Sequence, residues 1–291
     1  MTKIPVVFAA DHNFVMPTCV ALSSLLKNSE GETYDLYILS DTDVTSADRD
    51  ILSGHVTRLS GLSSLHFIEI SKDFDGGYEI RNISKAAYFR LLIPWLLPQY
   101  DKVIYADGDI VFTKGLKALY DIDLGDYYVG GCNTPGFHDG KPKKYVIGLG
   151  LDYKSYINSG VLLINAKAQR DNNLKDTYMH HSHDKYLYQD QDIINLVCKD
   201  RILLLSEDFN MSPKSVFMRT MHGESMSPTI IHYAGDKPWN TFTYCWNEWW
   251  DEYKHTLIFD KKRYMTVSHS AMDMKTFVAK ALSKIKYKLL H

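Results

Sequence analysis

Cysteine is scarce in this sequence, and the few cysteines lie far apart. Four are present, at positions 19, 132, 198 and 245, and no two of them form a Cys-x-x-Cys pair. Closely spaced cysteines are typical of structural zinc sites, and small secreted domains depend on many disulfides. We therefore expect neither a zinc site nor a disulfide framework, and we interpret the four side chains as reduced thiols of a cytoplasmic protein.

Long apolar stretches are absent as well. The chain contains no run of about 18 apolar residues, the length that a membrane-spanning helix requires. Met1–Pro5 are not followed by a long apolar region before a cleavage site, so no signal peptide is expected. Hydrophobic residues nevertheless make up 45% of the 291 residues. This content is enough for one large domain, alone or with an extension.

Charge of either sign is nearly balanced overall, at a net -2, but it is unevenly distributed. Residues 254–291 contain nine Lys or Arg residues against two acids, a balance of +7, which leaves -9 for residues 1–253. The acidic body argues against nucleic acid as a partner. Apolar residues recur at helical spacing among the tail lysines, at Met274, Val278, Leu282, Ile285 and Leu289.

This tail pattern is typical of a basic amphipathic helix that lies on an anionic membrane surface. A helix that docks on the body or on a partner subunit is the alternative. We therefore divide the chain into a main domain, 1–253, and a basic amphipathic C-terminal extension, 254–291. The expected location is cytoplasmic, with peripheral attachment at the inner face of the cell membrane.

Apolar strand-like segments alternate with helical ones along the first hundred residues. Such alternation is typical of an α/β fold with a mostly parallel central sheet and helices on both faces. In such sheets ligands bind beyond the carboxyl ends of the strands, where Asp11 and Asp107 are expected. The predicted strands are 4–10, 34–39, 65–70, 102–106, 127–132, 157–165, 201–205 and 229–234, the predicted helices are 16–28, 45–59, 84–97 and 189–199, and a mobile loop is predicted at 133–156.

The most informative segment is 102–112 (KVIYADGDIVF), in which two carboxylates interrupt an apolar stretch. Ionised carboxylates beside a hydrophobic core are costly unless their charge is offset. Magnesium or manganese would offset it, and in enzymes both often hold substrate phosphates as well. Gly108, between Asp107 and Asp109, leaves room for close approach of a ligand. The segment predicts a metal-diphosphate site at the end of a strand.

Other interpretations of Asp107 and Asp109 remain open at this point. An Asp-x-Asp tripeptide is frequent by chance, and a turn with two solvated carboxylates would also produce it. A haloacid-dehalogenase-like, magnesium-dependent phosphatase uses the same strand end, and Val111 fits its pattern, but the site would come unusually late in the chain. A glycoside hydrolase would use two carboxylates about 5–10 Å apart without a metal. A carbohydrate-binding module would not need diphosphate ligands.

Six segments, in this order, carry a resemblance to a known family. The chain resembles glycosyltransferase family 8, and within it the bacterial lipopolysaccharide galactosyl- and glucosyltransferases. The resemblance spans about residues 4–250 and rests on FAADHN (8–13), AYFRL (87–91), VIYADGD (103–109), NSGVLLIN (158–165), QDQD (189–192) and HYAGDKPW (232–239).

The resemblance implies a fold of the GT-A type and a retaining hexosyltransferase activity. The donor would be UDP-glucose or UDP-galactose, and the acceptor a glycan, glycoprotein, glycolipid or other lipid-linked sugar. The implied metal ligands are Asp107, Asp109 and His232, with Mn2+ as the expected ion and Mg2+ as the alternative. The implied donor contacts are Ala9, Ala10, Asp11, Asn13, Arg90, Asp107, Gly108, Asn158, Gly235 and Lys237.

The resemblance also implies residues that act on the transferred sugar. Asp190 would contact its hydroxyls and Gln191 would lie near the anomeric carbon, although neither is a convincing nucleophile. Asn133 is the acceptor contact that the resemblance implies. Trp246, in the aromatic segment 244–250, is a second expected acceptor contact because aromatic faces stack on sugar rings, and packing of a helix against the sheet is the commoner alternative. Asn133 stands where the lipopolysaccharide galactosyltransferases carry an acceptor-side Asp, which leaves their acceptor in doubt for this chain.

Each assignment has a structural alternative. Asp11 would also suit the cap of the following helix. Arg90, in an apolar helix, would also suit a structural ion pair. An aspartate at the start of helix 189–199 is favoured by the helix dipole alone. The chain also departs from the family at one point, because a single residue rather than two separates Gly235 from Lys237. This spacing implies a different path from Lys237 to the diphosphate.

Overall fold

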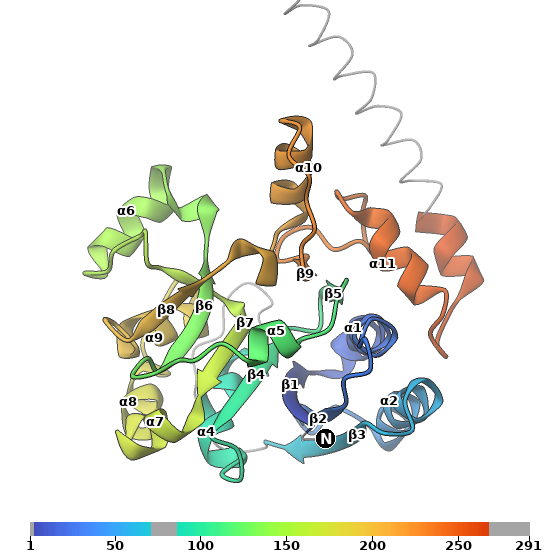
Figure 1. The fold of residues 1–291 in the computed structure, drawn as a ribbon, viewed down its shortest axis with the longest axis horizontal. Coiled ribbons are helices and arrows are strands. Elements are labelled where there is room, and N and C mark those ends of the chain that lie inside the picture. Colours follow the sequence, from blue (N-terminus) through green and yellow to red (C-terminus); the bar gives the residue numbers. More distant parts are fainter. Residues whose placement is uncertain (1–2, 71–85, 268–291) are drawn as a thin grey trace, which may run out of the picture.

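A seven-stranded sheet forms the centre of the molecule (Figure 1). The computed structural model describes residues 3–70 and 86–267. Strands β3, β2, β1 and β4 are parallel, as are β6 and β8, whereas β7 is antiparallel to both of its neighbours. Across the sheet the order is β3 (Ser64–Glu69), β2 (Tyr34–Ser40), β1 (Ile4–Ala10), β4 (Lys102–Ala106), β7 (Ile157–Asn165), β6 (Val129–Asn133) and β8 (Ile202–Leu205).

A separate two-stranded ribbon lies beside the end of β4. It pairs β5 (Ile110–Phe112) with β9 (Ile230–His232) in antiparallel register, so that Ile110 is opposite His232. Because β5 begins directly after Asp109, this pairing brings the end of the fourth strand next to a segment more than a hundred residues later in the sequence.

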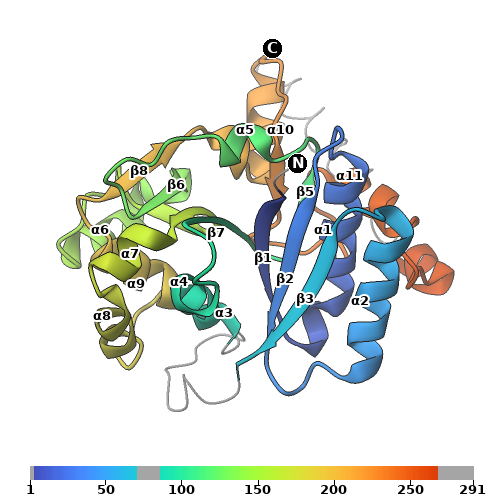
Figure 2. The same cartoon turned by 60° about the horizontal axis from the view of Figure 1, so that its bottom comes forward.

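Helices cover both faces of the sheet (Figure 2). One face is covered by α1 (Val15–Lys27) and α2 (Ser46–Leu59), and the other by α3 (Ala86–Phe89), η2 (Arg90–Leu92), α4 (Ile93–Leu96), α7 (Ala166–Asp171), α8 (Leu174–His181) and α9 (Gln189–Val197). Strand β1 shows why its sequence is apolar throughout. Val6 and Phe8 pack in the first layer and Val7 in the second, and all three are fully buried.

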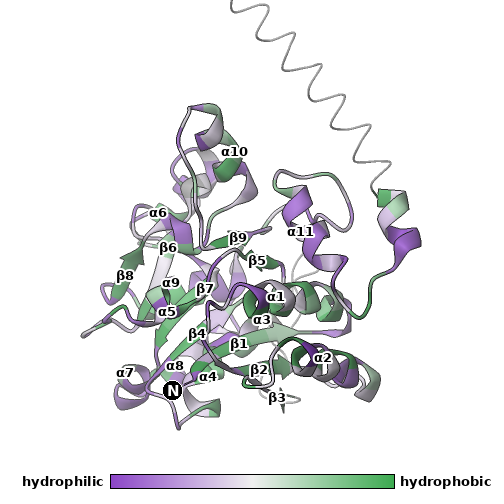
Figure 3. Cartoon of the chain, turned by 45° about the vertical axis from the view of Figure 1, so that its right-hand side comes forward, coloured by the Kyte–Doolittle hydropathy of each residue, from purple (hydrophilic) through white to green (hydrophobic). Residues whose placement is uncertain are grey.

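The remaining elements are short helices and 3-10 turns. They are η1 (His12–Phe14), α5 (Lys117–Tyr120), η3 (Pro135–Phe137), α6 (Gly140–Gly148), η4 (Glu207–Phe209), α10 (Pro213–Met221) and α11 (Trp246–Tyr253). Helix α11 buries Trp249 and Trp250 in a cluster that includes Val20 of α1. Helix α10 projects from the body and carries both hydrophobic and hydrophilic residues (Figure 3).

The mostly parallel α/β sheet predicted from the sequence is confirmed, and the predicted strands are present with small differences at their ends. The mobile loop predicted at 133–156 is wrong, because η3 and α6 lie within it. The apolar side of this segment packs in a small cluster of its own, formed by Phe137, Val146, Leu151 and Tyr156. Gly140, Pro142 and the lysines around them hid this short apolar pattern.

The helix predicted at 84–97 is present only in pieces. Residues 86–96 form α3, η2 and α4, and Pro94 stands in the first turn of α4. Proline lacks the backbone N–H that would continue the preceding helical hydrogen bonds, so a single long helix is disfavoured here. The predicted start at Ser84 lies outside the described residues. Thr45 caps α2 and forms a reciprocal capping box with Asp48.

The beginning of the basic extension packs on the body. Tyr264 and Val267 contact the aromatic cluster around Trp250. The predicted amphipathic helix with Met274 and Leu289 lies outside the described residues. Among residues 3–70 and 86–267, no helix combines the length and apolar character needed to span a bilayer.

Candidate active site

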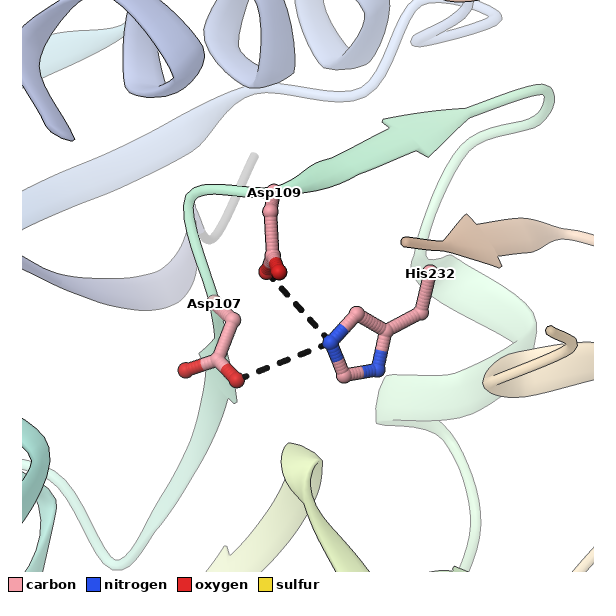
Figure 4. A group of neighbouring side chains, drawn as sticks. All are labelled: Asp107, Asp109 and His232. Atoms are coloured by element: carbon pink, nitrogen blue, oxygen red, sulfur yellow. Dashed lines mark ion pairs between the residues drawn. The ribbon is translucent and has the colours of Figure 1, made fainter. Parts of the chain in front are cut away.

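Asp107, Asp109 and His232 form the only group of three or more metal-ligand side chains among the described residues (Figure 4). One ligand atom from each lies within 4.8 Å of the others. Asp107 follows β4, Asp109 precedes β5, and His232 ends β9, so the ribbon brings them together. Nε2 of His232 lies 3.3 Å from Oδ1 of Asp109 and 3.7 Å from Oδ2 of Asp107.

Asp109 is almost fully buried and strongly stabilised as an anion. Burial alone would raise the pKa of Asp109, but His232 and Lys237 outweigh it and hold the pKa well below its usual range. The Nζ atom of Lys237 forms an ion pair with Oδ2 of Asp109 and donates to the Tyr233 carbonyl at 2.7 Å. Oδ1 of Asp109 is buried without a hydrogen-bond partner.

The opposite ring nitrogen of His232 has a partner of its own. Nδ1 lies 2.8 Å from Oδ1 of Asn210, which directs Nε2 toward the two carboxylates. Two carboxylates, an imidazole nitrogen held from behind and an Oδ1 of Asp109 that accepts no hydrogen bond suit a divalent cation of the manganese or magnesium type. The donor set therefore fits a metal.

Two glycines allow the close packing around this group. A Cβ at Gly160 of β7 would lie 2.1 Å from Cε1 of His232 and 2.8 Å from Oδ2 of Asp107. A Cβ at Gly108 would lie 2.6 Å from Oγ1 of Thr18 in α1. The room left at Gly108 is thus used by a helix, and its contact with a ligand stays a prediction.

Arg90 connects Asp107 with Asp190 in the interior of the protein. Its Nη2 lies 3.0 Å from Oδ1 of Asp107 and its Nε 3.2 Å from Oδ2 of Asp190. Nη1 donates to the Ser159 carbonyl at 2.7 Å, and the guanidinium lies over the Tyr105 ring. Burial raises the pKa of Asp190 to about 6, although Arg90 and Ser159 oppose the rise. The ion-pair interpretation of Arg90 is confirmed, and a direct donor contact stays a prediction.

Asn158 and Gln191 contact each other beside this ion pair. Nδ2 of Asn158 donates to Oε1 of Gln191 at 3.0 Å. Asp192, next along α9, has a different position. It is fully buried and accepts hydrogen bonds from the hydroxyls of Tyr145 in α6 and of Tyr156, just before β7, which fasten both segments to α9.

The residues at the end of β1 and just after it lie at the carboxyl end of the parallel strands, where a ligand is expected. Asp11 accepts from the backbone N–H of Phe14 at 3.0 Å and so caps η1, as the structural interpretation proposed. Its second oxygen leaves a ligand contact open as well. Asn13 is exposed, Ala9 is half-buried and Ala10 is buried. A contact of these residues with the donor stays a prediction.

A cavity of about 490 Å³ opens beside the metal-ligand group. His232 and Gly235 form one wall, the start of α10 at Ser212 a second, and Phe242–Tyr244 a third. The Tyr244 ring stacks on Phe217 of α10, with centroids 4.1 Å apart.

The two residues predicted to contact the acceptor, Asn133 and Trp246, are not part of the cavity wall. Trp246 is buried in the aromatic cluster with Trp250. Asn133 lies at the end of β6, and its Nδ2 donates to the backbone carbonyls of Tyr153, Lys154 and Tyr156. Neither lines the cavity.

Comparison with known proteins identifies the family. A model of glycosyl transferase family 8 matches residues 5–243. The chain belongs to glycosyltransferase family 8. It is therefore a transferase, and the phosphatase alternative is left without support.

Three relatives illustrate the similarity, and two of them are named glycosyltransferases. A Haemophilus influenzae protein named a glycosyltransferase is 29% identical over 81% of this chain and 72% of its own length. General stress protein A of Bacillus subtilis is 26% identical over 92% of this chain and 97% of its own length. The lipopolysaccharide 1,2-glucosyltransferase of Escherichia coli is 23% identical over 79% of this chain and 71% of its own length.

Solved structures agree on the fold. The galactosyltransferase LgtC, in complex with donor and acceptor sugar analogs, is 27% identical with a TM-score of 0.76, covering 89% of this chain and 98% of LgtC. The bifunctional glycosyltransferase WbbM is 23% identical with the same TM-score of 0.76, over 91% of this chain but about half of its own length, 51%. The fold of this family 8 chain is thus of the GT-A type.

Sequence reasoning missed two residues beside the metal-ligand group. Gly160 lies inside the segment 158–165 that carried the family resemblance, but a glycine in an apolar strand gave no sign of its contact with His232. Asn210 follows the short η4 helix and belongs to no recognisable motif. Only the fold places it behind the imidazole.

Proposed function

We propose that this protein transfers glucose or galactose from a UDP-sugar to a glycan or lipid-linked acceptor, with retention of anomeric configuration. The observation that carries the proposal is the group of Asp107, Asp109 and His232 in a family 8 chain. The match to LgtC, whose structure holds donor and acceptor sugar analogs, supports a nucleotide-sugar donor. The match to a lipopolysaccharide glucosyltransferase supports a glycan or glycolipid acceptor.

Asp107, Asp109 and His232 would hold a divalent cation, for which manganese suits the mixed carboxylate and imidazole ligands. When bound, this cation supplies charge neutralisation for the departing UDP. Lys237 would exchange its ion pair with Asp109 for the diphosphate, since its Nζ already lies at the edge of the group. The backbone at Ala9 and Ala10 and the side chains of Asp11 and Asn13 would bind the uridine.

Residues beside Asp107, on the side of the metal-ligand group that faces Arg90, would orient the sugar. Asn158, Asp190 and Gln191 lie around the buried guanidinium of Arg90, where hydroxyl groups would find both donors and acceptors. A structure of LgtC with an active-site glutamine replaced by glutamate supports a role for a glutamine in this family. In this chain we assign that role to Gln191.

The acceptor would enter through the cavity beside His232. Its wall at Tyr244 and Phe242 offers aromatic faces, which stack on sugar rings. Since neither Trp246 nor Asn133 lines the cavity, its lining favours Tyr244 as the aromatic acceptor contact.

A donor panel tests the proposal. The protein is incubated with Mn2+ and with UDP-glucose, UDP-galactose, UDP-N-acetylglucosamine or GDP-mannose, and nucleotide release is measured with and without EDTA. Slow hydrolysis of UDP-glucose or UDP-galactose that EDTA abolishes is expected. Asp109→Asn should lose metal-dependent turnover and keep its fold by circular dichroism. Absence of binding to every UDP-sugar in the presence of Mn2+ would refute the proposal.

We further propose peripheral attachment to the cytoplasmic face of the membrane through the basic extension. The support is the charge balance of +7 in residues 254–291. Deletion of residues 268–291 should weaken binding to vesicles that contain phosphatidylglycerol and leave binding to neutral vesicles low. Equal binding of the full and shortened chains would exclude this role.

A further inference from the structure

A line of hydrogen bonds runs from the metal-ligand group to the proposed sugar site. Nδ1 of His232 lies 2.8 Å from Oδ1 of Asn210. Nδ2 of Asn210 donates to Oδ1 of Asn158 at 2.9 Å. Nδ2 of Asn158 donates to Oε1 of Gln191 at 3.0 Å. One imidazole and three amides thus form a continuous chain between β9, the segment after η4, β7 and α9.

Two backbone N–H groups fix which amide atoms donate and which accept along this line of hydrogen bonds. The N–H of Gly160 donates to Oδ1 of Asn158 at 2.9 Å, and the N–H of Ser159 donates to Oε1 of Gln191 at 3.3 Å. A backbone N–H can only donate, so the atoms that it meets must be carbonyl oxygens. Neither Asn158 nor Gln191 can therefore be turned around without loss of a hydrogen bond.

The same logic reaches His232 through Asn210. Because Oδ1 of Asn158 accepts, Asn210 must offer its amide nitrogen there and its oxygen to the imidazole. An oxygen at this place requires a proton on Nδ1 of His232. The lone pair of the neutral ring is then on Nε2, which lies 3.3 Å from Asp109 and 3.7 Å from Asp107.

We propose that Asn210 is a positioning residue that holds His232 in the Nδ1–H form for metal binding and, at its other end, holds Asn158 for the sugar. This inference rests on the proposed function for its second half, since the sugar contact of Asn158 belongs to that proposal. The first half depends only on the described contacts. Partners behind a ligating imidazole typically change metal affinity by 10-fold to 100-fold.

Two substitutions at Asn210 separate the two ends. Asn210→Leu removes both hydrogen bonds at similar volume, so Mn2+ should bind about 10-fold to 100-fold more weakly. Asn210→Asp keeps an oxygen for Nδ1 but turns a second oxygen toward Oδ1 of Asn158. This variant should keep Mn2+ affinity within about threefold and raise the donor KM about 10-fold, the effect of one lost hydrogen bond.

Three measurements follow these variants. Mn2+ affinity is measured by electron paramagnetic resonance without any donor, so that it is independent of activity. Donor KM and kcat are measured at saturating Mn2+. The ring protonation of His232 is read from 15N chemical shifts of histidine-labelled, metal-free protein at alkaline pH, with His232→Gln to assign the signal. The wild type should show Nδ1–H, and Asn210→Leu should shift toward Nε2–H.

Asn165 provides a matched control. It lies at the opposite end of β7, and its side chain also makes several hydrogen bonds, to the carbonyls of Gly125 and Tyr127 and from the N–H of Ala168. Asn165→Leu should cost stability while Mn2+ affinity and the His232 signal stay unchanged. If Asn210→Leu does not fold, Asn210→Ser is measured in its place with the same expectation.

The outcomes distinguish this inference from the proposed function. Wild-type protein that binds Mn2+ but no UDP-sugar refutes the proposed function and leaves the His232 half testable. Wild-type Mn2+ affinity in Asn210→Leu, or a neutral His232 ring that carries its proton on Nε2 in the wild type, overturns the role of Asn210 at the metal. Unchanged donor KM in Asn210→Asp overturns its role at Asn158.

Discussion

A Cβ atom at position 160 would lie 2.1 Å from Cε1 of His232, so Gly160 and the imidazole occupy adjoining space in which no further atom fits. Gly160→Ala should displace His232 and lower Mn2+ affinity by at least 10-fold, because the added methyl also approaches Oδ2 of Asp107. Overpacking of this kind costs about 1–3 kcal/mol of stability. Calorimetric titration with Mn2+ and denaturant unfolding measure the two effects.

Gly61 is the control for this substitution, since a Cβ there would meet no atom within 4 Å. Gly61→Ala should leave both metal affinity and stability near those of the wild type. Wild-type Mn2+ affinity in Gly160→Ala would mean that His232 does not ligate the metal from its present position.

Arg90→Met tests the buried ion pair. The substitution leaves the carboxylates of Asp107 and Asp190 without their shared cation, and loss of one partner from a buried pair costs about 3–5 kcal/mol. The double variant Arg90→Met with Asp190→Asn removes one of the two stranded charges and should recover part of the loss. Urea unfolding of wild type, single and double variants measures this. A double variant no more stable than Arg90→Met would argue against the pairing with Asp190.

His55 gives the protein a predictable response to acid. This residue of α2 is fully buried, and burial, assisted by Arg58, lowers its pKa from 6.5 to about 4. Between these values the unfolded chain binds a proton that the folded protein does not. The free energy of unfolding must therefore fall as the pH falls from 6.5 to about 4, by about 3 kcal/mol from this group.

The variant His55→Gln lacks the titrating group. Its stability should vary less with pH across the same window, and the difference from wild type is the quantity of interest, since other groups titrate in both proteins. Parallel pH profiles for the two proteins would show that the pKa of His55 is not lowered.

Tyr244 and Trp246 offer a test of the acceptor side. Tyr244 lines the cavity, so Tyr244→Ala should raise the acceptor KM about 10-fold, equivalent to a lost aromatic contact of about 1.4 kcal/mol. Metal-dependent hydrolysis of the donor without acceptor should stay unchanged. Trp246→Phe, in the buried cluster, should lower stability and leave the acceptor KM near wild type. The opposite pattern would assign the acceptor contact to Trp246.

Much of the fold was predictable because local pattern and tertiary position agree. Strands such as 4–10 are apolar on both faces, since helices cover both sides of the sheet. Prediction failed where the apolar signal was short. Helix α6 buries mainly Val146, and its glycines and lysines dominate the pattern. The sequence shows the proline at position 94 that interrupts the helix. The alternation of α-helical and 3-10 turns around it depends on packing, which the sequence does not show.

The site was predictable only as far as motifs reach. Asp107 and Asp109 follow a strand, and the family resemblance added His232, which the ribbon does bring beside them. No local pattern predicts that Asn210 lies behind His232, because this contact depends on how η4 and β9 meet. The position of Arg90 between two carboxylates likewise follows from helix packing on β4 and β7 rather than from its own segment.

The ribbon of β5 and β9 also has a consequence for the order of assembly during synthesis. Asp107 and Asp109 are made early, but His232 and the strand that pairs with Ile110 come after most of the chain. Residues 230–232 must therefore emerge from the ribosome before the three side chains can meet. A nascent chain that ends before β9 holds two of these three side chains, so the proposed cation site is completed only after β9 has been made.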